Sequence, residues 1–155
     1  MATVRTLTGH SVGAMILVKV RAHNANGWGG YSALNTVGAR IETEPIQMAP
    51  PVFDAATSTT TSAVLTWTAL SGNDAGGAGV PISNYVVEWL PPSATVWATV
   101  ATTSSTTATI SGLSGGLTYQ FRVYADNKYG DGLVSTDISA IPAVAPDTPA
   151  APTTT

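Results

Sequence analysis

The stretch "LSGGLTYQFRVYADNKYG" (Leu113–Gly130) decides the fold of this chain. Within it, apolar side chains recur at every second position: Leu117, Tyr119, Phe121, Val123 and Ala125. A strand directs alternate side chains to opposite faces, so this spacing predicts a strand with one buried face. Asn127 and Gly130 follow, and these residue types favour a tight turn, because Asn bonds nearby backbone and glycine tolerates positive φ. The stretch therefore predicts a half-buried strand that runs into a hairpin.

Other runs of period two lie upstream. They place these apolar residues on one face of a strand: Ala63, Leu65 and Trp67 in "SAVLTWTAL", Tyr85, Val87 and Trp89 in "ISNYVVEWL", and Ala108 and Ile110 in "TATISGL". Turn signals separate the runs, and no window has a convincing helical period. The segments Glu44–Pro51 and Ile141–Thr155 are rich in proline and read as extended linkers. The sequence predicts an all-β chain that forms an antiparallel β-sandwich.

The decisive hairpin has a counterpart near the N-terminus. "VKVRAHNANGWGGYS" (18–32) aligns with "FRVYADNKYGDGLVS" (121–135) at a constant offset of 103 residues. The matched pairs are Val20 and Val123, Ala22 and Ala125, Asn24 and Asn127, Gly27 and Gly130, Gly29 and Gly132, and Ser32 and Ser135. The matches at Asn and Gly fall on turn positions. Such self-similarity predicts tandem repeats.

The segment from residue 47 to 143 resembles a fibronectin type III domain. Trp67 fits the core tryptophan of that family, and "YVVEW" (Tyr85–Trp89) fits its third strand. Leu113 and Tyr119 fit its tyrosine corner, although Gly115 and Leu117 stand where proline and threonine are usual. The resemblance implies an all-β, immunoglobulin-like antiparallel β-sandwich and says almost nothing about a ligand.

The resemblance divides the chain into three parts. Residues 1–46 are expected to be the C-terminal part of one such domain, with Leu7 near its corner and Ile16 in the tyrosine position. Residues 47–143 are expected to form a complete domain, and residues 144–155 a Pro/Thr-rich linker or tail. The first part lacks its preceding strands, and a lone hairpin is marginal in water. Either the chain is a piece of a longer array, or strands from another chain complete the half domain.

Composition excludes several classes of function. Charged residues make up 10% of the chain, and 24 Thr and 13 Ser keep its surface polar. No basic patch is visible, so nucleic acid is not expected as a partner. No apolar run is long enough to insert into a membrane, the start does not resemble a signal peptide, and the absence of cysteine excludes disulfides and thiolate metal sites.

No catalytic constellation appears in the sequence. His10 and His23 have no reactive partners at a motif spacing, and "GGAGVP" (Gly76–Pro81) lacks the lysine and the helix of a phosphate-binding loop. Asn73 with Asp74, and Asp126 with Asp131, are too loosely spaced for calcium and read as turn residues. We therefore expect no enzymatic activity, no metal and no cofactor.

Three aromatic residues are candidates for interaction. Trp28 and Tyr129 lie at hairpin tips, where recognition often sits, unless each folds back on its own loop or on a neighbouring domain. Trp97 is expected half-covered on an edge strand. The runs Ala56–Ser62 and Ala101–Thr109 read as solvated turns and strand ends or, alternatively, as sites of O-glycosylation.

These observations predict a structural or adhesive module of a tandem-repeat protein, extracellular or on the cell surface. Its partners are expected to be neighbouring repeats or copies of itself, with glycans possible, and it is expected to be able to assemble into a fibre or filament. Two alternatives remain open: an accessory module of a secreted carbohydrate-active enzyme, and the ligand-binding ectodomain of an adhesion receptor.

Overall fold

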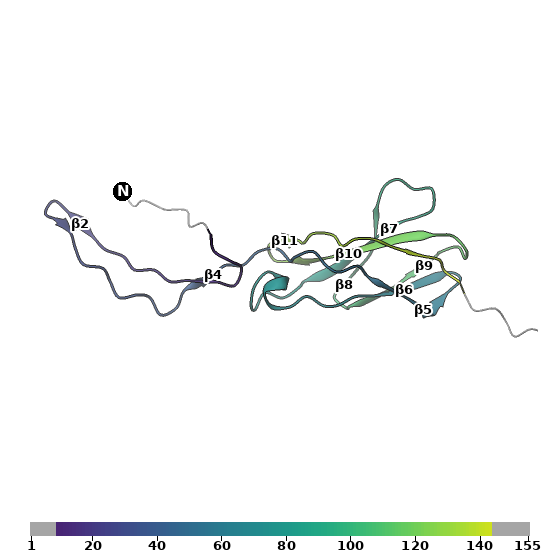
Figure 1. Cartoon of the computed structure of the whole chain (residues 1–155), viewed down its shortest axis with the longest axis horizontal. Coiled ribbons are helices and arrows are strands. Elements are labelled where there is room, and N and C mark those ends of the chain that lie inside the picture. The colour runs from purple at the N-terminus through teal and green to yellow at the C-terminus, as the bar shows by residue number, and fades with distance from the viewer. Residues whose placement is uncertain (1–8, 144–155) are drawn as a thin grey trace, which may run out of the picture.

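A computed structural model of the chain describes residues 9–143. Figure 1 shows a long two-stranded ribbon that extends from one end of a β-sandwich. We call residues 14–41 the N-terminal ribbon; the sandwich follows it. Among the described residues, no helix has the length and apolar character needed to cross a membrane.

The sandwich contains two antiparallel sheets. The first has the order β5 (Val52–Thr59), β6 (Ser62–Thr66) and β9 (Thr107–Ser111). The second has the order β11 (Gly130–Asp131), β10 (Tyr119–Asn127), β7 (Asn84–Leu90) and β8 (Ala98–Thr103), and β12 (Ile138–Ala140) also pairs with β10. A short 3-10 helix, η1 (Gly72–Ala75), lies in the connection between β6 and β7. This arrangement confirms the predicted all-β sandwich.

The core lies between the sheets. Most of the apolar residues that the period-two pattern predicted to be buried belong to it: Ala63, Leu65, Trp67, Tyr85, Val87, Ile110, Tyr119, Phe121, Val123 and Ala125. Trp89 and Ala108 are half-buried and pack against it. The Tyr119 hydroxyl accepts a hydrogen bond from the Ser114 N–H at 3.0 Å, beside the buried Leu113. This contact closes the corner that leads into β10. The prediction was wrong for Leu117, which is 46% exposed because the chain is still turning there, with Gly116 at φ 78°, and β10 begins only at Tyr119.

The proline-rich segments are not free linkers along their whole length. Met48 is 3% exposed and belongs to the core, while Pro51 and Pro142 are fully buried. The linker prediction was therefore wrong at these positions. Proline has no N–H, so an extended proline-rich segment at a sheet edge packs its side chains without forfeiting a sheet hydrogen bond. Residues 144–155 lie outside the described residues.

The N-terminal ribbon is a single antiparallel hairpin. Its base pairs β1 (Met15–Ile16) with β4 (Ala39–Arg40), and its tip pairs β2 (His23–Asn24) with β3 (Gly27–Trp28). Between them, the Ser32 N–H donates to the Val20 carbonyl at 2.8 Å and the Asn35 N–H to that of Val18 at 3.1 Å. Within the described residues, no second sheet covers the ribbon.

Candidate functional site

The two hairpins share a hydrogen-bond pattern at the offset of 103 residues. In the ribbon, the Gly29 N–H donates to the Ala22 carbonyl at 2.9 Å, and the Asn26 N–H donates to the Asn24 side chain at 2.9 Å. At the other end of the chain, Gly132 donates to Ala125 at 2.8 Å, and Tyr129 donates to the Asn127 side chain at 2.7 Å. The glycine after each turn has positive φ, 122° at Gly27 and 141° at Gly130. The sequence repeat thus corresponds to a repeat in backbone geometry.

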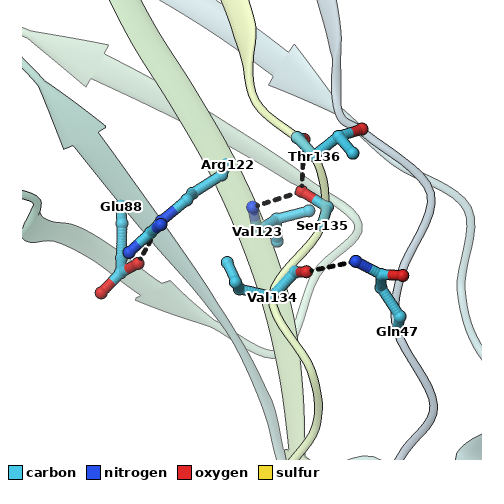
Figure 2. A network of polar contacts seen from close by, with 7 residues as sticks. All are labelled: Gln47, Glu88, Arg122, Val123, Val134, Ser135 and Thr136. Carbon is cyan, nitrogen blue, oxygen red and sulfur yellow. Dashed lines mark hydrogen bonds and ion pairs between the residues drawn. The ribbon is translucent and has the colours of Figure 1, made fainter.

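A serine reinforces each hairpin in the same way. Figure 2 shows Ser135, whose hydroxyl accepts from the Val123 N–H at 3.0 Å and donates to the Thr136 carbonyl at 2.8 Å. In the ribbon, the Ser32 hydroxyl accepts from the Val20 N–H at 3.0 Å and donates to the Ala33 carbonyl at 2.9 Å. The two serines therefore hold equivalent positions in their hairpins.

Burial distinguishes the two hairpins. Phe121 and Val123 are 0% exposed, whereas their counterparts Val18 and Val20 are 53% and 68% exposed. The ribbon therefore carries the apolar face of a sandwich strand, and residues 9–143 supply no opposing sheet for that face.

A polar junction joins the ribbon to the sandwich; we define it as residues 42–46. The Thr43 N–H donates to the Gly76 carbonyl at 2.9 Å, and the Ile46 N–H donates to the Asp74 carbonyl at 3.0 Å. The buried Asn127 side chain donates to the carbonyls of Thr43 at 2.8 Å and Ala75 at 2.9 Å. Asn127 thus ties the junction to both the η1 loop and the end of β10.

Charged groups also meet at the junction. The Glu42 carboxylate pairs with Lys128 at 2.8 Å and accepts a hydrogen bond from the Tyr129 hydroxyl. The hydrogen bonds from Lys128 and then Tyr129 hold the pKa of Glu42 below its ordinary value of 4.5. The same partnership with Glu42 raises the pKa of Lys128. The ionised pair is therefore the favoured state of this contact at neutral pH.

Two further polar contacts support the sheet next to the junction. In Figure 2, Gln47 donates to the Val134 carbonyl at 2.9 Å, which ties the start of the sandwich to the segment before β12. Arg122 on β10 pairs with Glu88 on β7 at 2.7 Å. These contacts stabilise the second sheet, which carries the hairpin between β10 and β11.

The three candidate aromatic residues lie in different surroundings. Trp28 is 60% exposed at the ribbon tip, against His23 and Arg21. Tyr129 is 43% exposed but bonds to Glu42, so it folds back on the junction. Trp97 is half-buried just before the edge strand β8, with the Arg122 guanidinium 4.2 Å from its ring centre. The structure does not bring these aromatic residues together.

The described residues offer no metal centre. Among residues 9–143, no three His, Cys, Asp or Glu side chains form a group that could hold an ion. Asp126 and Asp131 face each other across the β10–β11 pair, whereas Asn73 and Asp74 lie in η1. The Asn73 side chain packs closely against Gly13, where a Cβ would collide with its oxygen. Thr60 and Thr61, in the first Thr/Ser run, are exposed at the β5–β6 turn.

Sequence reasoning missed a series of stacked side chains on the ribbon. We call Lys19, Arg21, His23, Trp28 and Tyr31 the cation–aromatic ladder. Lys19 and Arg21 lie over the Tyr31 ring at 4.6 and 4.7 Å, and Arg21 also lies over the Trp28 ring at 4.3 Å. The His23 and Trp28 ring centres are 4.6 Å apart. The sequence does contain a signal for this ladder. Residues 19, 21 and 23 alternate with the apolar residues Val18, Val20 and Ala22, and the aromatic residues Trp28 and Tyr31 follow across the turn.

Comparison with known proteins gives one family. The model of the family described as "Fibronectin type III domain" matches residues 48–141. Neogenin from Rattus norvegicus is 34% identical over 139 residues, a match that covers 84% of this chain and 9% of neogenin. The chain therefore spans about a tenth of the length of this relative.

Solved structures agree with this match. The structure of titin domains A168–A170 is 28% identical, with a TM-score of 0.53, and the match covers 84% of this chain and 41% of the titin segment. The sixth fibronectin type III domain of human fibronectin type III domain containing protein 3 shares the fold at 24% identity. Its TM-score is 0.53, and the match covers 74% of this chain and all of that domain.

Proposed function

Because the chain belongs to the fibronectin type III family, we propose that it is a structural and adhesive module of a tandem-repeat protein, extracellular or on the cell surface. Domains of this family are typically non-catalytic modules. The observation that carries the proposal is the junction, where Asn127, Glu42 and Lys128 fix the ribbon against the sandwich. A junction of this kind sets the angle between successive repeats, so the protein acts as a stiff spacer.

In this proposal, residues 1–46 are the C-terminal part of a preceding repeat. The shared hydrogen bonds of Ser32 and Ser135 support it, as does the apolar face at Val18 and Val20. The neogenin match also supports it: 84% of 155 residues is about 130, more than the 114 that follow residue 41, where the ribbon ends. The similarity to a longer relative thus reaches into the ribbon.

A second candidate function is ligand binding by the ectodomain of an adhesion receptor. The exposed Trp28 favours it, because a large aromatic side chain at a hairpin tip is a common anchor for a protein partner. Assembly into a fibre belongs to the main proposal, since a contact between different surfaces of identical chains propagates when it does not close.

The stiffness of the junction tests the spacer role. The chain has no cysteine, so Ala39→Cys and Thr99→Cys, both at exposed positions, would carry two spin labels in otherwise native protein. We expect a narrow distribution of label-to-label distances by electron spin resonance. Gly76→Ala should broaden it, because a Cβ there would collide with the Thr43 carbonyl oxygen.

Gly79→Ala is the matched control for this experiment. Gly79 also has positive φ, 91° against 102° at Gly76, but a Cβ at Gly79 meets nothing within 4 Å. Both variants therefore share the backbone strain, and only Gly76→Ala disturbs the junction. The stiff spacer would be ruled out if the labelled chain that retains Gly76 gave a distribution of label-to-label distances as broad as that of Gly76→Ala.

A further inference from the structure

The cation–aromatic ladder lies on the outward face of the ribbon. On β10, the residues that alternate with the core are Arg122, Tyr124 and Asp126, which the offset of 103 relates to Lys19, Arg21 and His23. Whatever strands cover Val18 and Val20, the ladder points the opposite way. All five of its residues are exposed, so it is available to a partner in a complete repeat as well.

Charge is strongly segregated along the chain. Residues 1–41 contain four of the six Lys and Arg residues and no Asp or Glu, whereas all nine acidic residues follow position 41. The cations of the ladder therefore have no acidic neighbour on the ribbon itself. They lie over aromatic rings instead, Lys19 over Tyr31 and Arg21 over both Tyr31 and Trp28.

The corresponding face of the sandwich is acidic. We define the acidic face as Glu88, Asp126, Asp131 and Asp137. Asp126 and Asp131 are directly opposite each other across the β10–β11 pair, an arrangement of like charges that destabilises a sheet. Asp137 contributes an exposed carboxylate that bonds to Gln120, and Arg122 neutralises only Glu88.

Tyr124, at the centre of this face, experiences the resulting negative field. Burial, followed by the charges of Asp131, Glu88 and Asp126, raises its pKa. The two repeats thus present opposite charge from equivalent outward faces.

We propose that the cation–aromatic ladder of one copy docks on the acidic face of a second copy of this chain. The two surfaces are complementary in charge, and each copy carries one of each. The contact relieves the repulsion between Asp126 and Asp131 and supplies acidic partners to Lys19 and Arg21. It rests on the proposed adhesive role and specifies its partner, but it does not depend on the stiffness of the junction.

Charge-swap variants test this pairing. The double substitution Lys19→Glu with Arg21→Glu gives an all-acidic variant, in which both surfaces are acidic. The double substitution Asp131→Lys with Asp137→Lys gives a variant that we call all-basic, because the two lysines and Arg122 then outnumber Glu88 and Asp126, the remaining carboxylates of the second surface. All four positions are exposed, so both variants should melt within a few degrees of the unsubstituted protein.

Sedimentation of the 155-residue chain at low ionic strength is the measurement. We expect the unsubstituted protein to self-associate and to dissociate at about 0.5 M salt, where screening is strong. The all-acidic and all-basic variants should each remain monomeric alone, and their equimolar mixture should associate with at least tenfold greater affinity than either variant alone.

Three results would overturn the proposal: a monomeric unsubstituted protein at low salt, self-association of the all-acidic variant equal to that of the unsubstituted protein, or a monomeric mixture of the two variants. A different result would assign the ladder to a polyanion instead. In that case the protein would be monomeric but would be retained on a sulfated polysaccharide, and the all-acidic variant would not be retained. The spin-label distances measure the junction separately, so failure here leaves the spacer role standing.

Discussion

A single residue, Asn127, connects the hairpin signature to the junction. Its backbone lies at the end of β10, its side-chain oxygen accepts from Tyr129, and its side-chain nitrogen donates to Thr43 and Ala75. The equivalent residue Asn24 accepts from Asn26 in the same way but is exposed. The residue type was readable as a turn signal from sequence. Its long-range bonds were not, because they depend on where residues 43 and 75 come to lie.

Asn127→Asp should destabilise the sandwich by about 2–4 kcal/mol, because a buried carboxylate would face two carbonyl oxygens instead of donating to them. Asn24→Asp is the matched control and should change the free energy of unfolding by less than about 0.5 kcal/mol, since Asn24 is exposed. Urea unfolding of this protein measures both. Equal effects of the two substitutions would contradict the role assigned to Asn127.

For the strands, the alternation of apolar residues predicted correctly which side chains are buried within a strand, but it did not predict where a strand ends. Ala63, Leu65, Val87 and Val123 are all 0% exposed, as alternation requires. Leu117 continued the pattern in sequence but precedes β10, because sequence periodicity does not report the turn at Gly116. Met48 was hidden by its proline-rich surroundings, whose composition resembles that of a solvated linker.

The candidate sites were less predictable than the strands. Trp28 and Tyr129 occupy hairpin tips as the sequence indicated, yet only Tyr129 folds back on the junction. That difference depends on Glu42, which is 87 residues from Tyr129 in the chain. The cation–aromatic ladder was missed because its members come from two strands whose register only the pairing reveals.

The equivalent strands of the two hairpins give a matched pair of substitutions. Val123→Thr should cost about 1–3 kcal/mol, because it places an unpaired hydroxyl in a core position that is 0% exposed. Val20→Thr should have almost no effect in this protein, since Val20 is 68% exposed.

The same pair tests the tandem arrangement. In a polypeptide that includes the strands completing the first repeat, Val20→Thr should become as destabilising as Val123→Thr. Thermal unfolding of both lengths of polypeptide provides the comparison. A Val20→Thr substitution that remains neutral in the longer polypeptide would refute the assignment of residues 1–46 to a preceding repeat.

In the molecule as a whole, the ionised side chains of Glu42 and Lys128 join the ribbon to the sandwich. Glu42 has a lowered pKa, so its contribution is fully present above its ordinary value of 4.5 and is lost as the pH falls through the lowered folded value. Lys128 remains charged throughout this range because its pKa is raised. Acid should therefore loosen the junction by protonating Glu42.

Two observables follow the acid transition. The Glu42 carboxyl carbon, followed by NMR, should titrate below pH 4.5, and the spin-label distances should broaden over the same range. Lys128→Gln removes the largest cause of the shift and should return the titration toward 4.5. A Glu42 that titrates at 4.5 with Lys128 in place would exclude this account.

The opposite placement of the ribbon and the last strand has a mechanical consequence. The ribbon leaves the sandwich beside Asn127, whereas the chain after β12 leaves at the far end, where the Pro142 carbonyl accepts from Gly116 (Figure 1). In the proposed tandem array, tension between neighbouring repeats would therefore act along the strands and not across them. The hydrogen bonds that join β12 to β10, and Gln47 to Val134, would be loaded in shear and would share the force. Rupture would then require many bonds to break together, so resistance to pulling would be set by the rate of unfolding and not by the weakest single bond.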